Sequence, residues 1–135
     1  MLKGIDPLLT PELLKVLAEM GHGDEIVIAD ANFTAASLAA GKPIVRLPGA
    51  GVERASQAVL SLLALDAAVA QPVAFMQVSE YPAGTLSALQ RRMLAWLQQA
   101  GHAEPAQCEA TERFAFYERV RGAFAIVLTS EAYAR

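Results

Sequence analysis

The amino-acid sequence predicts a single-domain α/β fold, a three-layer α/β/α sandwich with a mostly parallel mixed sheet. Several short segments are apolar on both faces and rich in β-branched residues, as buried strands are. They alternate with longer segments whose apolar residues recur at helical spacing, which is typical of α/β proteins. No linker or repeat interrupts the 135 residues, so we assign 1–135 to one domain.

Helices and strands are expected to alternate along the whole chain. The first helix is marked most clearly, because Thr10 can cap its start, Pro11 suits the first helical position and Gly21 can end it. The β-branched run that follows ends at Asp30, which puts this carboxylate beyond the carboxyl end of a buried strand. The expected elements, in order, are a helix at 11–20, strands at 25–30 and 44–47, a helix at 52–65, a strand at 73–78, helices at 85–100 and 112–120, and a strand at 124–128.

Charge and hydropathy exclude two classes of partner. The chain carries a net charge of −3 and its basic residues are scattered, whereas a surface that binds nucleic acid needs a one-sided basic stripe. The longest apolar stretch, 58–70, is interrupted by Ser61 and Asp66 and is too short to cross a bilayer. We therefore expect neither nucleic acid nor a membrane as a partner.

Cysteine content and composition indicate the setting in which the protein works. A single cysteine, Cys108, excludes an internal disulfide, and no secretory signal is visible, so a cytoplasmic location is expected. Hydrophobic residues make up 54% of the chain and charged residues only 19%. Contacts between subunits could hide part of this apolar surface, although an alanine-rich monomer would have the same composition.

The loop between the first helix and the first strand brings several ionisable side chains together. His22 lies between two glycines and is followed by Asp24 and Glu25, with Asp30 after the strand. Histidine side chains exist in both protonation states near neutral pH, so such a group can give a proton and take one back. A histidine at a helix end can equally be structural, stabilised by the helix dipole. These residues alone leave both interpretations open.

A run of aromatic and charged residues precedes the last strand. Phe114 and Phe116 are two residues apart on an expected helix, so they cannot both face the core. Aromatic rings can stack on the C–H faces of a sugar, while a guanidinium such as that of Arg113 binds its hydroxyls. The alternative is a set of core aromatics with Glu118 and Arg119 as a surface pair, and the run taken by itself favours that alternative.

Patterns for metals, cofactors and nucleophilic serines are missing from the sequence. His22 and His102 are isolated, and one cysteine cannot build a structural metal site. Gly49-Ala50-Gly51 precedes a helix but lacks the rest of a nucleotide-binding fingerprint, so a plain loop leading into the helix is expected. No serine stands in a nucleophile elbow. We therefore expect a site that uses neither a metal nor a cofactor.

Taken together, segments along nearly the whole chain resemble the ribose pyranase/fucose mutarotase family, and its fucose mutarotase branch in particular. The ribose pyranase branch usually lacks the Arg-Phe-Ala-Phe-Tyr run that this chain carries. The matching segments are Met1-Leu2-Lys3-Gly4-Ile5, 11–25, Asp30-Ala31-Asn32-Phe33, Arg113-Phe114-Ala115-Phe116-Tyr117-Glu118-Arg119 and 123–129.

This resemblance implies an isomerase that interconverts the anomers of a free monosaccharide, most of all L-fucose, by general acid–base ring opening and closure. It also implies a layered α/β fold and a homo-oligomeric ring with pockets at subunit boundaries. By position, His22 matches the family's catalytic acid/base, and Asp30 and Arg113 match its sugar-binding residues. Tyr117 belongs to the same motif as Arg113.

Two places depart from the fucose mutarotase pattern. Asn32 stands where that branch tends to carry a histidine. The family ends in Tyr-x-Asn and an apolar tail; Tyr133 matches the tyrosine, which helps to form the pocket, but Arg135 stands in place of the asparagine. These departures keep two alternatives open, a non-catalytic monosaccharide-binding or sugar-transport accessory protein and a ribose pyranase. A nucleotide-binding regulator on a similar scaffold is a third, against which the missing phosphate-loop glycines count.

Overall fold

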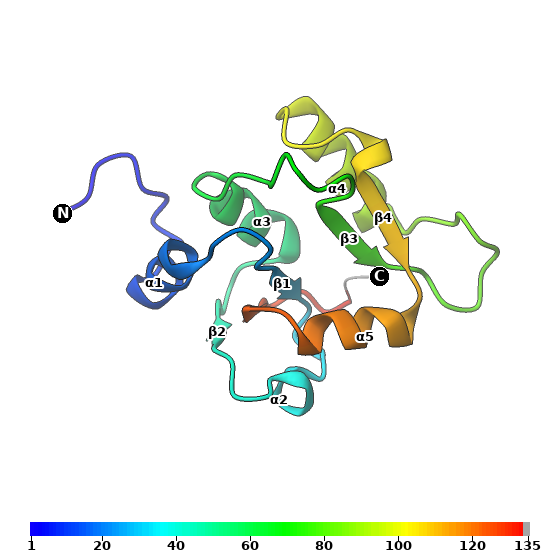
Figure 1. Cartoon of the computed structure of the whole chain (residues 1–135), viewed down its shortest axis with the longest axis horizontal. Coiled ribbons are helices and arrows are strands. Elements are labelled where there is room, and N and C mark those ends of the chain that lie inside the picture. The colour runs from blue at the N-terminus through cyan, green and yellow to red at the C-terminus, as the bar shows by residue number, and fades with distance from the viewer. Residues whose placement is uncertain (134–135) are drawn as a thin grey trace.

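The computed structural model describes residues 1–133, in which helices and strands alternate (Figure 1). The first helix and the first strand lie where the sequence predicts them. The elements in order are α1 (Pro11–Glu19), β1 (Ile26–Ala29), α2 (Ala35–Leu38), β2 (Ile44–Arg46), α3 (Val52–Leu60), β3 (Val73–Met76), α4 (Ala88–Gln99), a 3₁₀ turn η1 (Pro105–Gln107), β4 (Cys108–Thr111), α5 (Arg113–Arg121) and β5 (Ala125–Leu128).

The strands form two separate sheets. One has three strands in the order β1-β5-β2, and the other pairs β3 with β4. Every strand pair in the described part of the chain is parallel, with Ile28 opposite Val127 in the first sheet and Phe75 opposite Ala110 in the second. The α/β class is therefore confirmed, while the expected mixed sheet is divided into two parallel ones.

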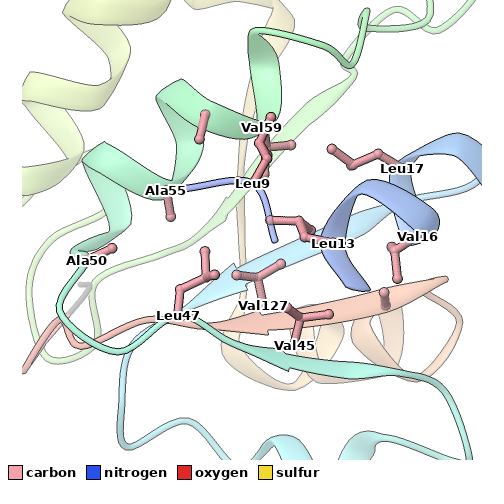
Figure 2. Close-up of a cluster of buried hydrophobic side chains, with 12 residues drawn as sticks. Leu9, Leu13, Val16, Leu17, Val45, Leu47, Ala50, Ala55, Val59 and Val127 are labelled. Atoms are coloured by element: carbon pink, nitrogen blue, oxygen red, sulfur yellow. The ribbon is translucent and has the colours of Figure 1, made fainter. Parts of the chain in front are cut away.

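Helices cover both faces of the three-stranded sheet, which confirms the three layers. On one face, Val127 of β5 packs with side chains of α1 and α3, among them Leu13 and Val59 (Figure 2). On the other face, Ile126 packs against Leu38 of α2 and Val120 of α5. Because neighbouring strand residues point to opposite faces, the apolar run of β5 fills both layers of the core.

Helix boundaries follow the capping residues. Thr10 Oγ1 accepts the backbone N–H of Leu13 at 3.2 Å, which starts α1 as predicted. Ser87 and Gln90 form a reciprocal capping box, so α4 begins at Ala88 and not at 85. The expected helix 52–65 ends already at Leu60, where Ser61 Oγ bonds back to the carbonyl of Ala58 at 2.6 Å.

An arginine of α5 links the two sheets. Two nitrogens of Arg119 lie 2.9 and 2.7 Å from Oε2 of Glu25, which directly precedes β1. A third nitrogen lies 3.4 Å from Oε2 of Glu109 in β4. Hydrogen bonding to Glu25 is the largest cause that raises the pKa of Arg119. The alternative of a Glu118–Arg119 surface pair is therefore wrong, because Glu118 pairs with Arg121 one turn further along.

Candidate functional site

A cavity of about 1210 Å³ lies between the two sheets and is lined by residues of β1, α3, β3, α4 and α5. It exceeds the roughly 300–1,000 Å³ that is usual for small-molecule pockets. All the candidate site residues predicted from the sequence line this one cavity, namely His22, Asp30, Arg113, Tyr117 and Tyr133. The structure thus brings together side chains that are more than 100 positions apart in the chain.

His22 stands on a tight turn after α1. The backbone N–H of Gly21 donates to Asp24 Oδ2 at 2.8 Å, and Gly23 has a φ of +84°, a conformation that glycine adopts without strain. The turn leaves the His22 side chain 98% exposed. Its Nδ1 lies 3.3 Å from Asp66 Oδ2, so the other ring nitrogen, Nε2, is the one available to a ligand.

Asp66 is a site residue that sequence analysis did not select. It lies in the segment between α3 and β3, lines the same cavity, and has a side chain that is only 25% exposed. The backbone N–H of Ala68 donates to its Oδ1 at 2.9 Å, and this bond, followed by the contact with His22, holds the pKa of Asp66 below its ordinary value. One signal in the sequence pointed to it, a carboxylate that interrupts the apolar stretch 58–70.

Asp30 directly follows β1, as predicted, and its carboxylate closes a small turn. Oδ1 accepts the backbone N–H of Asn32 at 3.0 Å, which is a turn that aspartate favours. The side-chain amide of Asn32 donates to the carbonyl of Ala132 at 3.2 Å, and the N–H of Ala31 donates to the carbonyl of Glu131 at 2.9 Å. The departure at Asn32 therefore ties the loop of Asp30 to the C-terminal segment.

The C-terminal segment also holds the start of α3. Glu131 Oε1 accepts the N–H of Val52 at 3.2 Å, and Ser130 Oγ accepts the N–H of Gly49 at 2.6 Å. A Cβ on Gly51 would meet Glu131 Oε1 at 2.9 Å, so only glycine fits there without displacement. The glycine pair thus forms a loop leading into a helix, as expected, and the protein's own carboxylate occupies the helix N-terminus.

Helix α5 presents a cation and aromatic rings to the cavity. Arg113 Nε donates to the Tyr117 hydroxyl at 3.0 Å, and the guanidinium carbon lies 5.5 Å from the centroid of the Tyr117 ring. Phe33 meets the edges of Phe116 and Tyr117 at 6.3 and 5.9 Å between centroids. Phe116 is half-buried whereas Phe114 is 67% exposed, which confirms that the two cannot both face the core.

Tyr133 reaches the cavity from the C-terminal segment, with 62% of its surface exposed. Arg135, which stands at the asparagine position of the family motif, lies outside the described residues.

Neither a cluster of potential metal ligands nor a helix that could cross a membrane is found in residues 1–133. Among these residues, no three or more histidine, cysteine or carboxylate side chains are grouped so as to hold a metal ion. No helix of the same residues is long and apolar enough to cross a membrane.

The arrangement suits a small, neutral, hydroxyl-rich ligand. An exposed histidine can carry a proton, a carboxylate and a guanidinium can bind hydroxyls, and an aromatic ring can cover an apolar face. All of these groups line one cavity, with His22 before strand β1 and Asp30 directly after it.

Known proteins share both the sequence and the fold. The chain matches the RbsD / FucU transport protein family over residues 3–134. It is 44% identical to the L-fucose mutarotase of Actinobacillus pleuropneumoniae serotype 5b over 132 residues, which cover 97% of this chain and 88% of the relative. Identity to the fucose mutarotase of Homo sapiens is also 44%, over 96% of this chain and 85% of that protein. The crystal structure of the fucose mutarotase from Streptococcus pneumoniae in complex with L-fucose superposes with a TM-score of 0.83, at 34% identity over 97% of this chain and 90% of that one.

Proposed function

Since the chain belongs to the RbsD / FucU transport protein family, we propose that it is a sugar mutarotase, an isomerase that interconverts the anomers of free L-fucose. The observation that carries the proposal is the exposed imidazole of His22 on the cavity that Asp30, Arg113 and Tyr117 also line. Relatives that are 44% identical over nearly the whole chain are named fucose mutarotases, which supports L-fucose as the sugar.

In the proposed mechanism His22 carries one proton through a ring-opening cycle. Nε2 takes the proton of the C1 hydroxyl, the C1–O bond to the ring oxygen breaks as the aldehyde forms, and the imidazolium gives the proton to the ring oxygen. Rotation about the C1–C2 bond and the reverse steps close the ring as the other anomer. A positioned acid/base contributes roughly 10²–10⁴-fold, which suffices for a reaction that already proceeds in water. No metal or cofactor takes part in this cycle.

Three side chains orient the sugar in this proposal. Asp30 accepts and Arg113 donates hydrogen bonds to hydroxyls, so together they fix the ring relative to His22. The Tyr117 hydroxyl holds the Arg113 guanidinium at 3.0 Å, and its ring offers an apolar surface. Tyr133 closes the cavity from the C-terminal side.

We extend the proposal to a homo-oligomeric ring, in which residues 1–135 of each subunit form a single domain. The cavity is larger than one monosaccharide needs, and exposed aromatic side chains such as Phe114 and Tyr133 stand near it. A neighbouring subunit that packs against them would narrow the cavity and bury the rings.

We also propose a cytoplasmic location. The single cysteine, Cys108, supports it, because a protein with one cysteine cannot form an internal disulfide and suits a reducing compartment.

Saturation-transfer NMR on L-fucose tests the function, with D-ribose and D-galactose measured alongside. Saturating one anomeric proton should reduce the signal of the other anomer only when protein is present, and most strongly for L-fucose. Transfer that is strongest for D-ribose would favour the ribose pyranase alternative. A sugar that binds without any transfer would indicate a non-catalytic sugar-binding or transport accessory protein.

A further inference from the structure

We propose that Ser56 is a sugar-binding residue, whose hydroxyl forms a hydrogen bond with a hydroxyl group of the bound monosaccharide. This inference rests on the proposed function and adds a contact on a wall of the cavity that no motif marks. Ser56 belongs to helix α3, lines the cavity between the two sheets, and is only 6% exposed.

The hydroxyl of Ser56 is buried without a partner in the described part of the chain. A helical serine can bond back to a carbonyl of the preceding turn, as Ser61 does to Ala58 at 2.6 Å. The side chain of Ser56 forms no hydrogen bond of this or any other kind with residues 1–133. Burying an unpaired hydroxyl is unfavourable, so a ligand that supplies the missing partner binds more tightly for it.

The other residues of α3 that line the cavity are apolar. They are Val52, Val59 and Leu60, and with Ser56 they recur at a spacing of three or four residues, so all four lie on one face of the helix. A wall that served packing alone would favour an apolar residue at position 56 as well. A single hydroxyl within this wall fits a ligand that is partly apolar and carries hydroxyl groups, as a monosaccharide does.

The start of α3 is tied to the loop of Asp30. Glu131 joins the two, because its Oε1 accepts the N–H of Val52 at 3.2 Å and its backbone carbonyl accepts the N–H of Ala31 at 2.9 Å. Ser56 comes four residues after Val52, which places it about 6 Å further along the helix axis.

The opposite end of α3 leads towards the other end of the cavity. The segment that follows the helix contacts His22, which precedes β1, whereas Asp30 follows β1. Ser56 therefore lies on the wall between these two ends, where a sugar that extends from one towards the other passes it.

The serine hydroxyl suits this contact because it can both donate and accept a hydrogen bond, as sugar hydroxyls do. A hydroxyl away from C1 keeps its structure while the ring opens and closes. Its bond to Ser56 therefore stabilises the bound sugar and the transition state to the same extent. Such a contact changes the affinity for the sugar and leaves kcat as it is.

Titration calorimetry with L-fucose, together with saturation-transfer NMR, tests the proposal on Ser56→Ala. Loss of one hydrogen bond should raise both Kd and KM about fivefold, with kcat unchanged. The melting temperature of the sugar-free variant should rise by about 2–4 °C, because alanine favours the helix and the unpaired hydroxyl is gone. Ser37→Ala is the matched control, since Ser37 lies exposed on helix α2 outside the cavity lining, and its affinity and kcat should equal those of the wild type.

Monodeoxy derivatives of L-fucose at C2, C3 and C4 identify the hydroxyl that Ser56 binds. One of the three should lose about fivefold in affinity for the wild type relative to Ser56→Ala, because only the wild type still has the serine hydroxyl to leave unpaired. The other two derivatives should lose the same factor with both proteins.

A wild-type Kd for L-fucose in Ser56→Ala would overturn the proposal, as would equal losses for all three derivatives with both proteins. A lower kcat with an unchanged Kd, or a lower melting temperature of sugar-free Ser56→Ala, would contradict a binding role equally. Wild-type protein that binds L-fucose without exchange would contradict the proposed function, whereas the Kd values would still decide the role of Ser56. Wild-type protein that binds no L-fucose would overturn both.

Discussion

The two sheets differ in how much of their surface is buried. The central strand β5 of the three-stranded sheet contains Ala125, Ile126 and Val127, all completely buried between two helical layers. In β3 of the second sheet all four residues are only half-buried, and in β4 only Thr111 is buried. Stability therefore resides mainly in the first sheet, whereas the second serves chiefly as a wall of the cavity. Figure 1 shows α1 and the β3–β4 pair at opposite ends of the molecule.

The same substitution, valine to alanine, should lower the free energy of unfolding by very different amounts in the two sheets. Val127→Ala removes two buried methyl groups from the central strand and should cost about 2.5 kcal/mol of unfolding free energy. Val73→Ala in β3 should cost about 1 kcal/mol, because its side chain is only half-buried. Urea unfolding of the two variants measures both values. Equal losses would contradict the difference in burial.

Much of the three-stranded half could be predicted from sequence because its signals are local. Thr10 and Pro11 start α1 by bonds and geometry within one turn, and the β-branched run before Asp30 has few alternatives to a buried strand. The division into two sheets could not be predicted, since hydrophobic periodicity does not tell which strands are neighbours. Strand β4, with the sequence Cys-Glu-Ala-Thr, has little β-propensity and forms by pairing with β3.

The residues of the candidate site also divide into those that local motifs predict and those that depend on long-range contacts. The positions of His22, Asp30 and Arg113 follow from motifs, and all three residues line the same cavity. Asp66 and the bonds of Asn32 to the C-terminal segment depend on contacts between residues 44 and 100 positions apart. The local sequence marks Asp66 only as a carboxylate within an apolar stretch, and it does not specify which residues these side chains contact.

Loss of the Arg119 ion pairs that link the two sheets should have the next largest effect on the free energy of unfolding. Arg119→Met leaves the carboxylates of Glu25 and Glu109 without their shared cation and should cost about 1.5 kcal/mol, more than an exposed ion pair. Arg121→Met, on the same helix, removes an exposed pair with Glu118 and should cost less than about 0.5 kcal/mol. Chemical denaturation of both variants compares them, and similar costs would argue against a specific link.

Two buried threonines, one at each sheet, differ in their hydrogen bonding. Thr129 Oγ1, beyond β5, donates to the carbonyl of Ala29 at 2.8 Å, so Thr129→Val should cost about 1 kcal/mol. Thr111 Oγ1, in β4, is buried without a hydrogen-bond partner among the described residues, so Thr111→Val should stabilise the protein by up to about 1 kcal/mol. A lower melting temperature for Thr129→Val and a higher one for Thr111→Val would support this difference in hydrogen bonding. A lower melting temperature for both variants would refute it.

The smallest expected effect concerns acid stability. Arg54 hydrogen bonds lower the pKa of Asp6 in the folded protein, so the stabilisation is complete above the ordinary pKa of aspartate, about 3.9. It is lost as the pH falls through the lowered folded pKa. Between pH 6 and 2, the melting temperature of Asp6→Asn should therefore fall slightly less steeply with decreasing pH than that of the wild type. Identical slopes of melting temperature against pH would mean that the Asp6–Arg54 pair contributes nothing to stability.

We propose that the cavity between the sheets is a mutarotase site in which His22 carries the proton. Saturation-transfer NMR on L-fucose with His22→Gln tests it most directly, with His102→Gln as the matched control outside the cavity lining. His22→Gln should lower the exchange rate about 100-fold, as expected for loss of a general acid/base, with an unchanged melting temperature because its side chain is exposed. His102→Gln should exchange as fast as the wild type. Full exchange by a folded His22→Gln protein would rule out His22 as the group that carries the proton.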